Sequence, residues 1–107
     1  KMKDQEKKIQ ELQLIEHNLS NLSMQKQSFM SRLMENENAL NEVNETKKQA
    51  YKIIGSIMVA AEKEELKKEL DSEKEILNLR IKSIEKQENK LKERTQELQK
   101  EIMKELK

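Results

Sequence analysis

The chain has no cysteine, no proline and no tryptophan, a single glycine at Gly55 and a single histidine at His17. A sequence without cysteine forms neither disulfides nor thiolate nucleophiles, which is in keeping with a reducing, cytoplasmic compartment. One glycine cannot supply the Gly-rich loop that cradles phosphates. One histidine without a cysteine lacks the ligand set of a usual zinc site. These absences predict a protein without a cofactor or a bound metal.

Long hydrophobic runs and an excess of one charge are also missing. The 22 Lys and Arg residues are interspersed with 21 Asp and Glu residues, whereas a nucleic-acid binder usually shows a clustered basic face. No stretch approaches the ~20 apolar residues of a membrane span, and the start shows no signal-peptide pattern. The carboxylates lie among lysines, so no pair is isolated from water for acid–base catalysis. We predict that the protein is not an enzyme and binds neither nucleic acid nor a membrane.

The feature that is present is a heptad repeat in both halves of the chain. In the first half, ten positions follow one another in alternating steps of three and four, and eight of them are apolar: Leu12, Ile15, Leu19, Leu22, Phe29, Leu33, Leu40 and Val43. Lys26 and Asn36 occupy the other two. The second half has Leu70, Leu77, Ile84, Leu91 and Leu98 at every seventh position. A hydrophobic content of 34% is low for a compact globular core, but it suffices for the narrow seam of a helix pair. Each half is therefore predicted to form one long coiled-coil helix.

The leucines of the two halves are arranged symmetrically about Gly55. Leu40 and Leu70 lie equally far from it along the chain, as do Leu33 and Leu77, Leu19 and Leu91, and Leu12 and Leu98. A chain that folds back at Gly55 sets these residues against one another. The symmetry therefore predicts one antiparallel helical hairpin.

Two polar residues, Lys26 and Glu88, interrupt the predicted seam. Polar groups in a seam usually cost stability and can fix the register of the helices. One interpretation is a locally wet seam in which long side chains extend toward water. The other is that these breaks let the helices separate around bulky partners.

The segment Tyr51 to Ala60 differs from both halves, because it is apolar, rich in β-branched residues and broken once by Gly55-Ser56. This pattern predicts a tight β-hairpin, with Ile54 opposite Ile57 and Ile53 opposite Met58. Both faces of such a hairpin are apolar. An isolated two-stranded hairpin is marginal in water and has two unpaired edges. We therefore predict that it pairs with hairpins of other chains to close a sheet or barrel. The predicted oligomerisation residues are Tyr51, Ile53, Ile54, Gly55, Ile57, Met58 and Val59.

Apolar residues also gather at the helix ends far from the hairpin. They are Met2, Ile9, Leu12, Leu14 and Ile15 in the first half and Leu98, Ile102, Met103 and Leu106 in the second. One interpretation is that scattered exposed apolar side chains are ordinary. The functional interpretation is an adaptable apolar tip that binds unfolded chains, to which methionine is well suited.

Three stretches resemble one protein family. They are Gln25-Lys26-Gln27, the segment Tyr51-Lys52-Ile53-Ile54-Gly55 leading into Ile57-Met58-Val59, and Leu77-Asn78-Leu79-Arg80-Ile81-Lys82-Ser83-Ile84-Glu85-Lys86-Gln87-Glu88 followed by Leu91. Together with the order helix, hairpin, helix, they are similar to the β-type subunits of prefoldin, with the archaeal type matching best.

The resemblance implies a hexameric, cytoplasmic co-chaperone of two α-type and four β-type subunits. Its hairpins form a double β-barrel body, and its coiled-coil tips capture unfolded polypeptides without ATP and deliver them to a group II chaperonin. The expected fold is mainly α, a long antiparallel two-helix coiled coil joined by a β-hairpin that assembles into an inter-subunit β-barrel. We expect one domain over 1–107, with a helix at 1–49, the hairpin at 50–61 and a helix at 62–107.

Two other functions are alternatives to this one, a structural scaffold and a membrane-surface helix. A structural coiled-coil scaffold would continue the helix through residues 51–60 or use a polar loop there. A membrane-surface helix would show a much stronger separation of basic and apolar residues.

Overall fold

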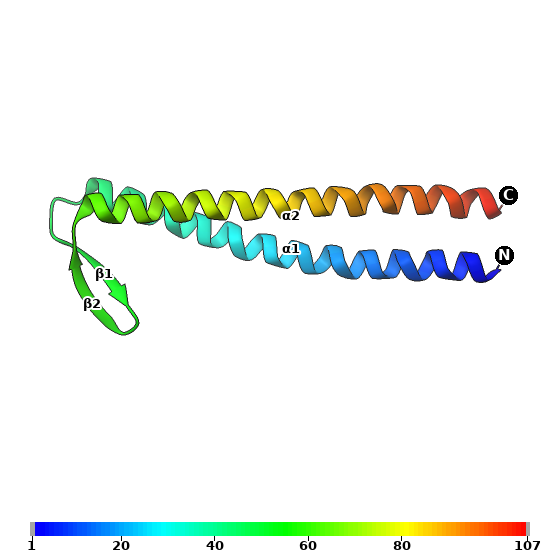
Figure 1. Ribbon diagram of the computed structural model, residues 1–107, viewed down its shortest axis with the longest axis horizontal. Helices are drawn as coiled ribbons and strands as arrows, with labels where there is room; N and C mark the ends of the chain where they lie inside the picture. The colour runs from blue at the N-terminus through cyan, green and yellow to red at the C-terminus, as the bar shows by residue number, and fades with distance from the viewer. Residues whose placement is uncertain (1, 107) are drawn as a thin grey trace. The chain divides into compact units, whose positions relative to one another are not determined.

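The computed structural model describes residues 2–106, and side chains from residue 3 onward. The elements follow the order α1 (Met2–Glu45), β1 (Ala50–Ile54), β2 (Ile57–Ala61) and α2 (Lys63–Leu106) (Figure 1). The expectation of a mainly α fold with a β-hairpin between two long helices is confirmed. The first helix ends at Glu45, which is earlier than the boundary at 49 expected from the sequence.

The end of α1 is set by local hydrogen bonds. The amide of Thr46 donates to the carbonyl of Glu42 at 2.9 Å and closes the last turn. The Thr46 hydroxyl then accepts a hydrogen bond from the amide of Lys48 at 3.3 Å. A hydroxyl that binds a nearby backbone amide offers the chain an alternative to further helix. Residues 46–49 therefore form a short connection.

The hairpin has the expected register. Ile54 pairs with Ile57, Ile53 with Met58 and Lys52 with Val59 in an antiparallel two-stranded sheet. Gly55 has a φ of 61°, and no other residue of the described chain has a positive φ. A positive φ at only the first central residue is characteristic of a type II′ turn, where glycine avoids the penalty of a Cβ atom.

Gln49 closes the open end of the hairpin. Its side-chain amide donates to the carbonyl of Ala50 at 3.0 Å and to the carbonyl of Ala61 at 3.1 Å. Ala50 and Ala61 are the last paired positions of the two strands. One side chain therefore joins the two strands at the end of the hairpin opposite its turn.

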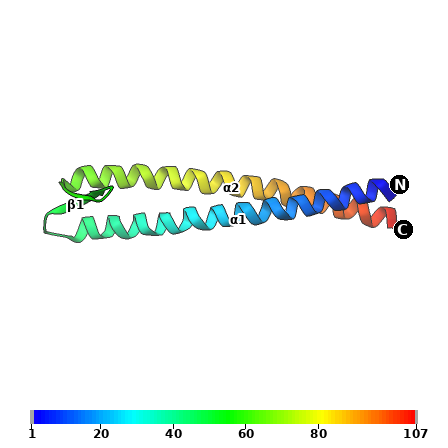
Figure 2. The same cartoon turned by 90° about the horizontal axis from the view of Figure 1, so that it is seen from below.

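The described chain divides into two compact units. Unit 1 combines the chain up to Gln27 with the chain from Lys82 onward, and unit 2 is Ser28–Ile81. Within each unit, segments of α1 and α2 run side by side in opposite directions, and the hairpin belongs to unit 2 (Figures 1 and 2).

Polar contacts between α1 and α2 show the antiparallel order in each unit. In unit 1, Lys8 contacts Glu101 and Lys26 contacts Glu88, so the residue number falls in α2 as it rises in α1. In unit 2, the guanidinium of Arg32 lies 4.0 Å from the carboxylate of Glu73. The side-chain amide of Asn36, further along α1, donates to the carbonyl of Leu70 at 2.9 Å.

Burial follows the predicted heptad positions. Ile15, Ile84 and Leu98 are buried in unit 1, and Leu77 is buried in unit 2. The remaining seam leucines and isoleucines are half-buried, which is expected for a contact only two helices wide. This pattern confirms the seam that the heptad repeat predicts.

Candidate interaction surfaces

The hairpin exposes its apolar side chains on both faces. Tyr51, Ile53, Ile54, Ile57, Met58 and Val59 are all exposed, and Ile53 reaches 70%. Alternate residues of a strand point to opposite faces, and the exposed residues include members of both faces. Neither face is therefore covered by another element of the described chain. Gly55 provides the turn, and a Cβ atom added there would meet nothing within 4 Å. The predicted oligomerisation residues thus leave apolar side chains exposed on both faces of the hairpin.

The apolar residues proposed for the tips separate into two groups. Ile9, Leu14, Met103 and Leu106 are exposed. Ile15 and Leu98 are buried between the helices of unit 1, and Leu12 and Ile102 are half-buried there. The side chain of Met2 lies outside the part that the structure describes. Among the tip residues whose side chains the structure describes, the fully exposed apolar ones are therefore those of the first group.

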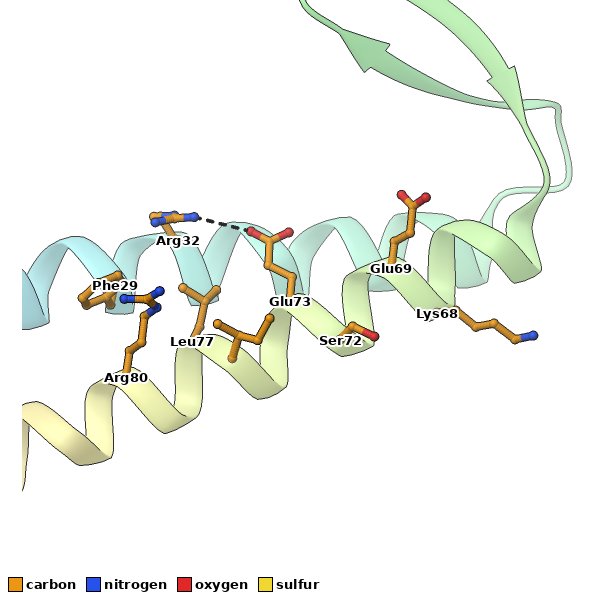
Figure 3. A pocket seen from close by; sticks show the side chains of 9 residues that line it. Phe29, Arg32, Lys68, Glu69, Ser72, Glu73, Leu77 and Arg80 are labelled. Atoms are coloured by element: carbon orange, nitrogen blue, oxygen red, sulfur yellow. Dashed lines mark ion pairs between the residues drawn. The ribbon is translucent and has the colours of Figure 1, made fainter.

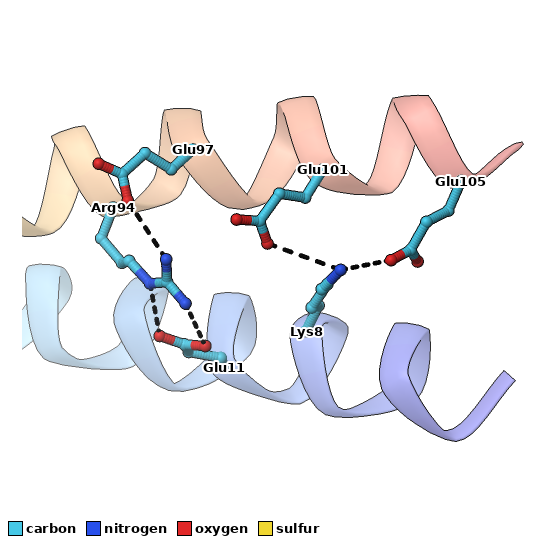
Figure 4. A network of polar contacts seen from close by, with 6 residues as sticks. All are labelled: Lys8, Glu11, Arg94, Glu97, Glu101 and Glu105. Carbon is cyan, nitrogen blue, oxygen red and sulfur yellow. Dashed lines mark hydrogen bonds and ion pairs between the residues drawn. The ribbon is translucent and has the colours of Figure 1, made fainter. Parts of the chain in front are cut away.

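A network of ion pairs lies beside these residues in unit 1. Arg94 donates to both carboxylate oxygens of Glu11, at 2.8 and 3.2 Å, and to Glu97 at 3.2 Å. Lys8 lies between the carboxylates of Glu101 and Glu105 (Figure 4). The contacts of Arg94 with Glu11 and of Lys8 with Glu101 and Glu105 join α1 to α2, whereas the contact of Arg94 with Glu97 lies within α2.

The network changes the pKa values of its members. Hydrogen bonding from Arg94 lowers the pKa of Glu11 below its ordinary value of 4.5. The hydrogen bond with Glu105 raises the pKa of Lys8 above 10.5. The pKa of Arg94 also rises, chiefly through its hydrogen bonds to Glu11. Each shift favours the charged form and so stabilises the contact between the helices.

The two polar residues predicted to interrupt the seam bind each other. Lys26 donates to Glu88 at 2.9 Å, and the Glu88 residue is buried, with 7% exposed. This hydrogen bond raises the pKa of Lys26. The symmetry about Gly55 does not predict this pair, because Lys26 and Glu88 lie at unequal distances from Gly55 along the chain.

A groove of about 770 Å³ lies in unit 2 beside the contact of α1 with α2. Phe29 and Arg32 line it from α1, and Glu73, Ile76 and Arg80 are among the residues that line it from α2 (Figure 3). The guanidinium carbons of Arg32 and Arg80 lie 5.9 and 5.7 Å from the centre of the Phe29 ring. Both distances suit cation–π attraction.

The described residues hold neither a metal-binding cluster nor a membrane-spanning helix. No group of three or more His, Cys, Asp or Glu side chains in residues 2–106 is placed to hold a metal ion. Within the same residues, neither helix is long and apolar enough to cross a membrane. His17 faces Asn21, with 3.4 Å between their side-chain nitrogens.

Taken together, the fold defines a mainly α protein in which a β-hairpin with two apolar faces joins the helices of an antiparallel coiled coil. A family model described as "Prefoldin subunit" matches residues 3–107. The chain therefore belongs to the prefoldin subunit family.

Relatives and a solved structure agree with this assignment. The chain is 38% identical over 93 residues to the prefoldin subunit beta of Sulfurisphaera tokodaii, covering 85% of this chain and 74% of the relative. It is 33% identical over 96 residues to that of Archaeoglobus fulgidus, covering 88% and 83%. The crystal structure of a Thermococcus prefoldin beta subunit superposes with a TM-score of 0.92 at 28% identity, over 97% of this chain and 93% of that one.

Membership of the family establishes the general role of the chain. Prefoldin subunits are non-enzymatic chaperone components that assemble with other prefoldin subunits. The resemblance found in the sequence is confirmed, and the chain is a chaperone subunit similar to the beta type.

Proposed function

We propose that the chain is a β-type subunit of a cytoplasmic hexamer that contains two α-type and four β-type subunits. The hexamer captures unfolded polypeptides without ATP at the coiled-coil tips and delivers them to a group II chaperonin. The observation that carries this proposal is the exposure of apolar side chains at two places, the hairpin and the tip of unit 1.

The hairpin supports the proposed assembly. Its apolar residues are exposed on both faces, and its two strands have free edges in the described chain. Strand edges of this kind pair readily with other strands, and a closed barrel removes every edge. A barrel built from several such hairpins would cover the apolar faces and the edges together. This geometry favours an assembly over a structural rod.

The tip supports the proposed capture of clients. Ile9, Leu14, Met103 and Leu106 are exposed in a region rich in charged side chains. Unfolded polypeptides present apolar segments of many shapes, and flexible side chains such as methionine adapt to them. The contact needs no nucleotide, because burial of apolar surface supplies its free energy.

The proposal is tested by replacing the four exposed tip residues Ile9, Leu14, Met103 and Leu106 with glutamine. Glutamine keeps helix propensity but removes the apolar surface. We expect the assembled mass to be unchanged by light scattering and protection of a refolding client from aggregation to be lost. The matched control carries glutamine at Met34, which is also exposed on a helix but belongs to unit 2.

The control should protect the client as well as the unsubstituted protein does. Full protection by the four-residue variant would show that the tip is not the binding surface. A loss of protection by the control alone would place the client-binding surface in unit 2.

A further inference from the structure

We propose that the ion pair of Lys52 with Glu69 holds the hairpin at the angle in which it pairs with the hairpins of other subunits. Lys52 lies on β1 and Glu69 on α2, and both belong to unit 2. The two are positioning residues for assembly and not part of the apolar contact itself. The inference rests on the proposed function, because it takes the hairpin as the interface between subunits.

The ion pair is the polar contact that ties the hairpin to a helix. The ammonium of Lys52 lies 2.9 Å from one carboxylate oxygen of Glu69 and 2.8 Å from the other. Glu69 points from α2 toward the side on which the hairpin lies (Figure 3). Within residues 3–106, no other hydrogen bond or ion pair joins a strand residue to a helix residue.

No apolar packing competes with this contact. The large apolar side chains of the hairpin are exposed by 43% or more, so none of them is buried against α1 or α2. An exposed ion pair adds little to a fold that hydrophobic contacts already stabilise. Here only this pair and the short connections, residues 46–49 and Glu62, restrain the hairpin. A weak contact can therefore decide the direction of the hairpin.

The ion pair also decides which face of the hairpin turns toward α2. Residues directly opposite one another in two strands share a face, so the side chains of Lys52 and Val59 lie on the same face. Val59 is 43% exposed, the lowest value among the large apolar side chains of the hairpin. Ile53 and Met58 form a pair on the other face and are 70% and 65% exposed. That second face is therefore the one turned away from α2 and toward an incoming chain.

Assembly makes the orientation of each hairpin matter. Hairpins that close one sheet have to meet at a defined angle, and a hairpin that swings freely loses conformational entropy when it joins them. A contact that orients the hairpin beforehand lowers this entropic cost in every subunit that carries it. Reversal of one charge of the pair is therefore expected to weaken assembly while the helices of the single chain remain folded.

Spin labels test the orienting role. Because the chain has no cysteine, Ser56→Cys and Asn78→Cys label the turn of the hairpin and an exposed position of α2 in the same unit. Labelled chains are diluted into unlabelled ones, so that pulsed electron paramagnetic resonance measures distances within one chain. We expect a narrow distance distribution in the parent chain and a wider one with Lys52→Glu. Lys52→Glu combined with Glu69→Lys should make it narrow again.

The same charge variants, without the cysteines, test the effect on assembly with an α-type subunit. Light scattering measures the chain concentration at half-maximal assembly. We expect Lys52→Glu and Glu69→Lys each to raise this concentration at least about threefold, because repulsion replaces attraction. The combined swap should restore it, since the summed length of the two side chains is unchanged.

Glu65→Lys is the matched control. It makes the same change of charge one turn earlier on α2, at a residue that forms no ion pair within the described chain. The control should assemble at the same concentration as the unsubstituted chain. Circular dichroism should show equal helix content in the control and in all the charge variants.

Other outcomes would overturn the inference. An unchanged distance distribution with Lys52→Glu would show that the ion pair does not orient the hairpin. A wider distribution with unaltered assembly would show that assembly does not depend on this orientation. Failure of the combined swap to restore assembly would show that the two residues do not act as a pair. The proposed function fails separately, if the unsubstituted chain forms no assembly with the α-type subunit.

Discussion

Lys26 and Glu88 show how two side chains modify a hydrophobic contact. Charged groups lose hydration when they enter an interface, and their mutual attraction often only balances that cost. The pair occupies seam positions that leucine would fill with apolar contacts. Its main contribution is therefore expected to be the register of the helices, because a shift of one heptad would separate the two charges.

We predict that replacing both residues with leucine raises the melting temperature by about 5 °C, since the seam gains apolar burial and loses a costly ion pair. Lys26→Leu alone should lower it, because Glu88 would stay buried without its partner. Thermal unfolding followed by circular dichroism measures both. A double variant less stable than either single variant would contradict this interpretation.

The direction of helical side chains explains why the sequence did not predict this pair. Side chains on a helix lean toward its N-terminus. In antiparallel helices Lys26 leans away from the turn and Glu88 leans toward it, so each enters the layer of the other. Matching residues by equal distance from Gly55 identifies the apolar layers correctly but misses contacts between adjacent layers. Adding this lean to the symmetry argument would have identified the pair.

At the scale of elements, the ion pairs of unit 1 connect α1 to α2 beside the tip. Arg94 holds Glu11 through two hydrogen bonds, whereas Arg32 and Glu73 in unit 2 approach only to 4.0 Å. Exposed ion pairs contribute little to the stability of a fold unless their geometry is favourable or they form a network. The Arg94 contact meets both conditions, and the Arg32 contact meets neither.

We predict a measurable coupling between Arg94 and Glu11 in a double-mutant cycle of glutamine substitutions, read from thermal unfolding. It should shrink between ~0.05 and ~1 M NaCl, because salt screens exposed charges. The cycle for Arg32 and Glu73 serves as the control and should show little coupling at either salt concentration. Equal coupling in the two cycles would contradict the role assigned to bidentate geometry.

The same contact predicts a pH dependence. The pKa of Glu11 is lowered in the folded state, so its stabilising effect is present above the ordinary value of 4.5 and is lost as the pH falls through the lowered value. Lys8 behaves in the opposite sense. Its pKa is raised, so its effect is present below 10.5 and is lost as the pH rises through the raised value.

The elements themselves could largely be predicted from the sequence. The heptad steps locate the seam, and the single turn-forming glycine determines the hairpin register. The end of α1 could not be placed, because no proline or glycine directly follows Glu45 and the stop depends on a hydroxyl hydrogen bond at Thr46. Gln49 was missed for a similar reason, since its two carbonyl partners are brought together only by folding.

At the scale of the whole molecule, the hairpin decides whether the chain is complete on its own. We predict that Ile53→Asp combined with Ile57→Asp dissociates the assembly, because the two positions lie on opposite faces and both faces would receive a buried charge. Light scattering measures the mass, and circular dichroism should show the helices retained. The control, Met30→Asp, alters an exposed apolar residue of α1 and should leave the mass unchanged.

If the double variant still forms an intact hexamer, the hairpin is not part of the interface between subunits. Loss of helix in the double variant would instead show that the hairpin supports folding of the single chain. Fold class, family and the apolar character of both surfaces could be predicted from the sequence. The division of the tip into buried and exposed residues could not, because the heptad pattern puts Leu12 and Ile15 in the seam without excluding them from a client site.

The bare hairpin has a consequence for how cells must handle this chain. A copy made in excess of its partners would leave the apolar strands of the hairpin exposed. Exposed apolar segments are also what distinguishes misfolded proteins, which cells degrade. We expect such unassembled copies to aggregate or to be degraded. The cell would therefore have to synthesise the different subunits in matching amounts. A chaperone subunit would thus itself need its partner subunits as soon as it has been synthesised.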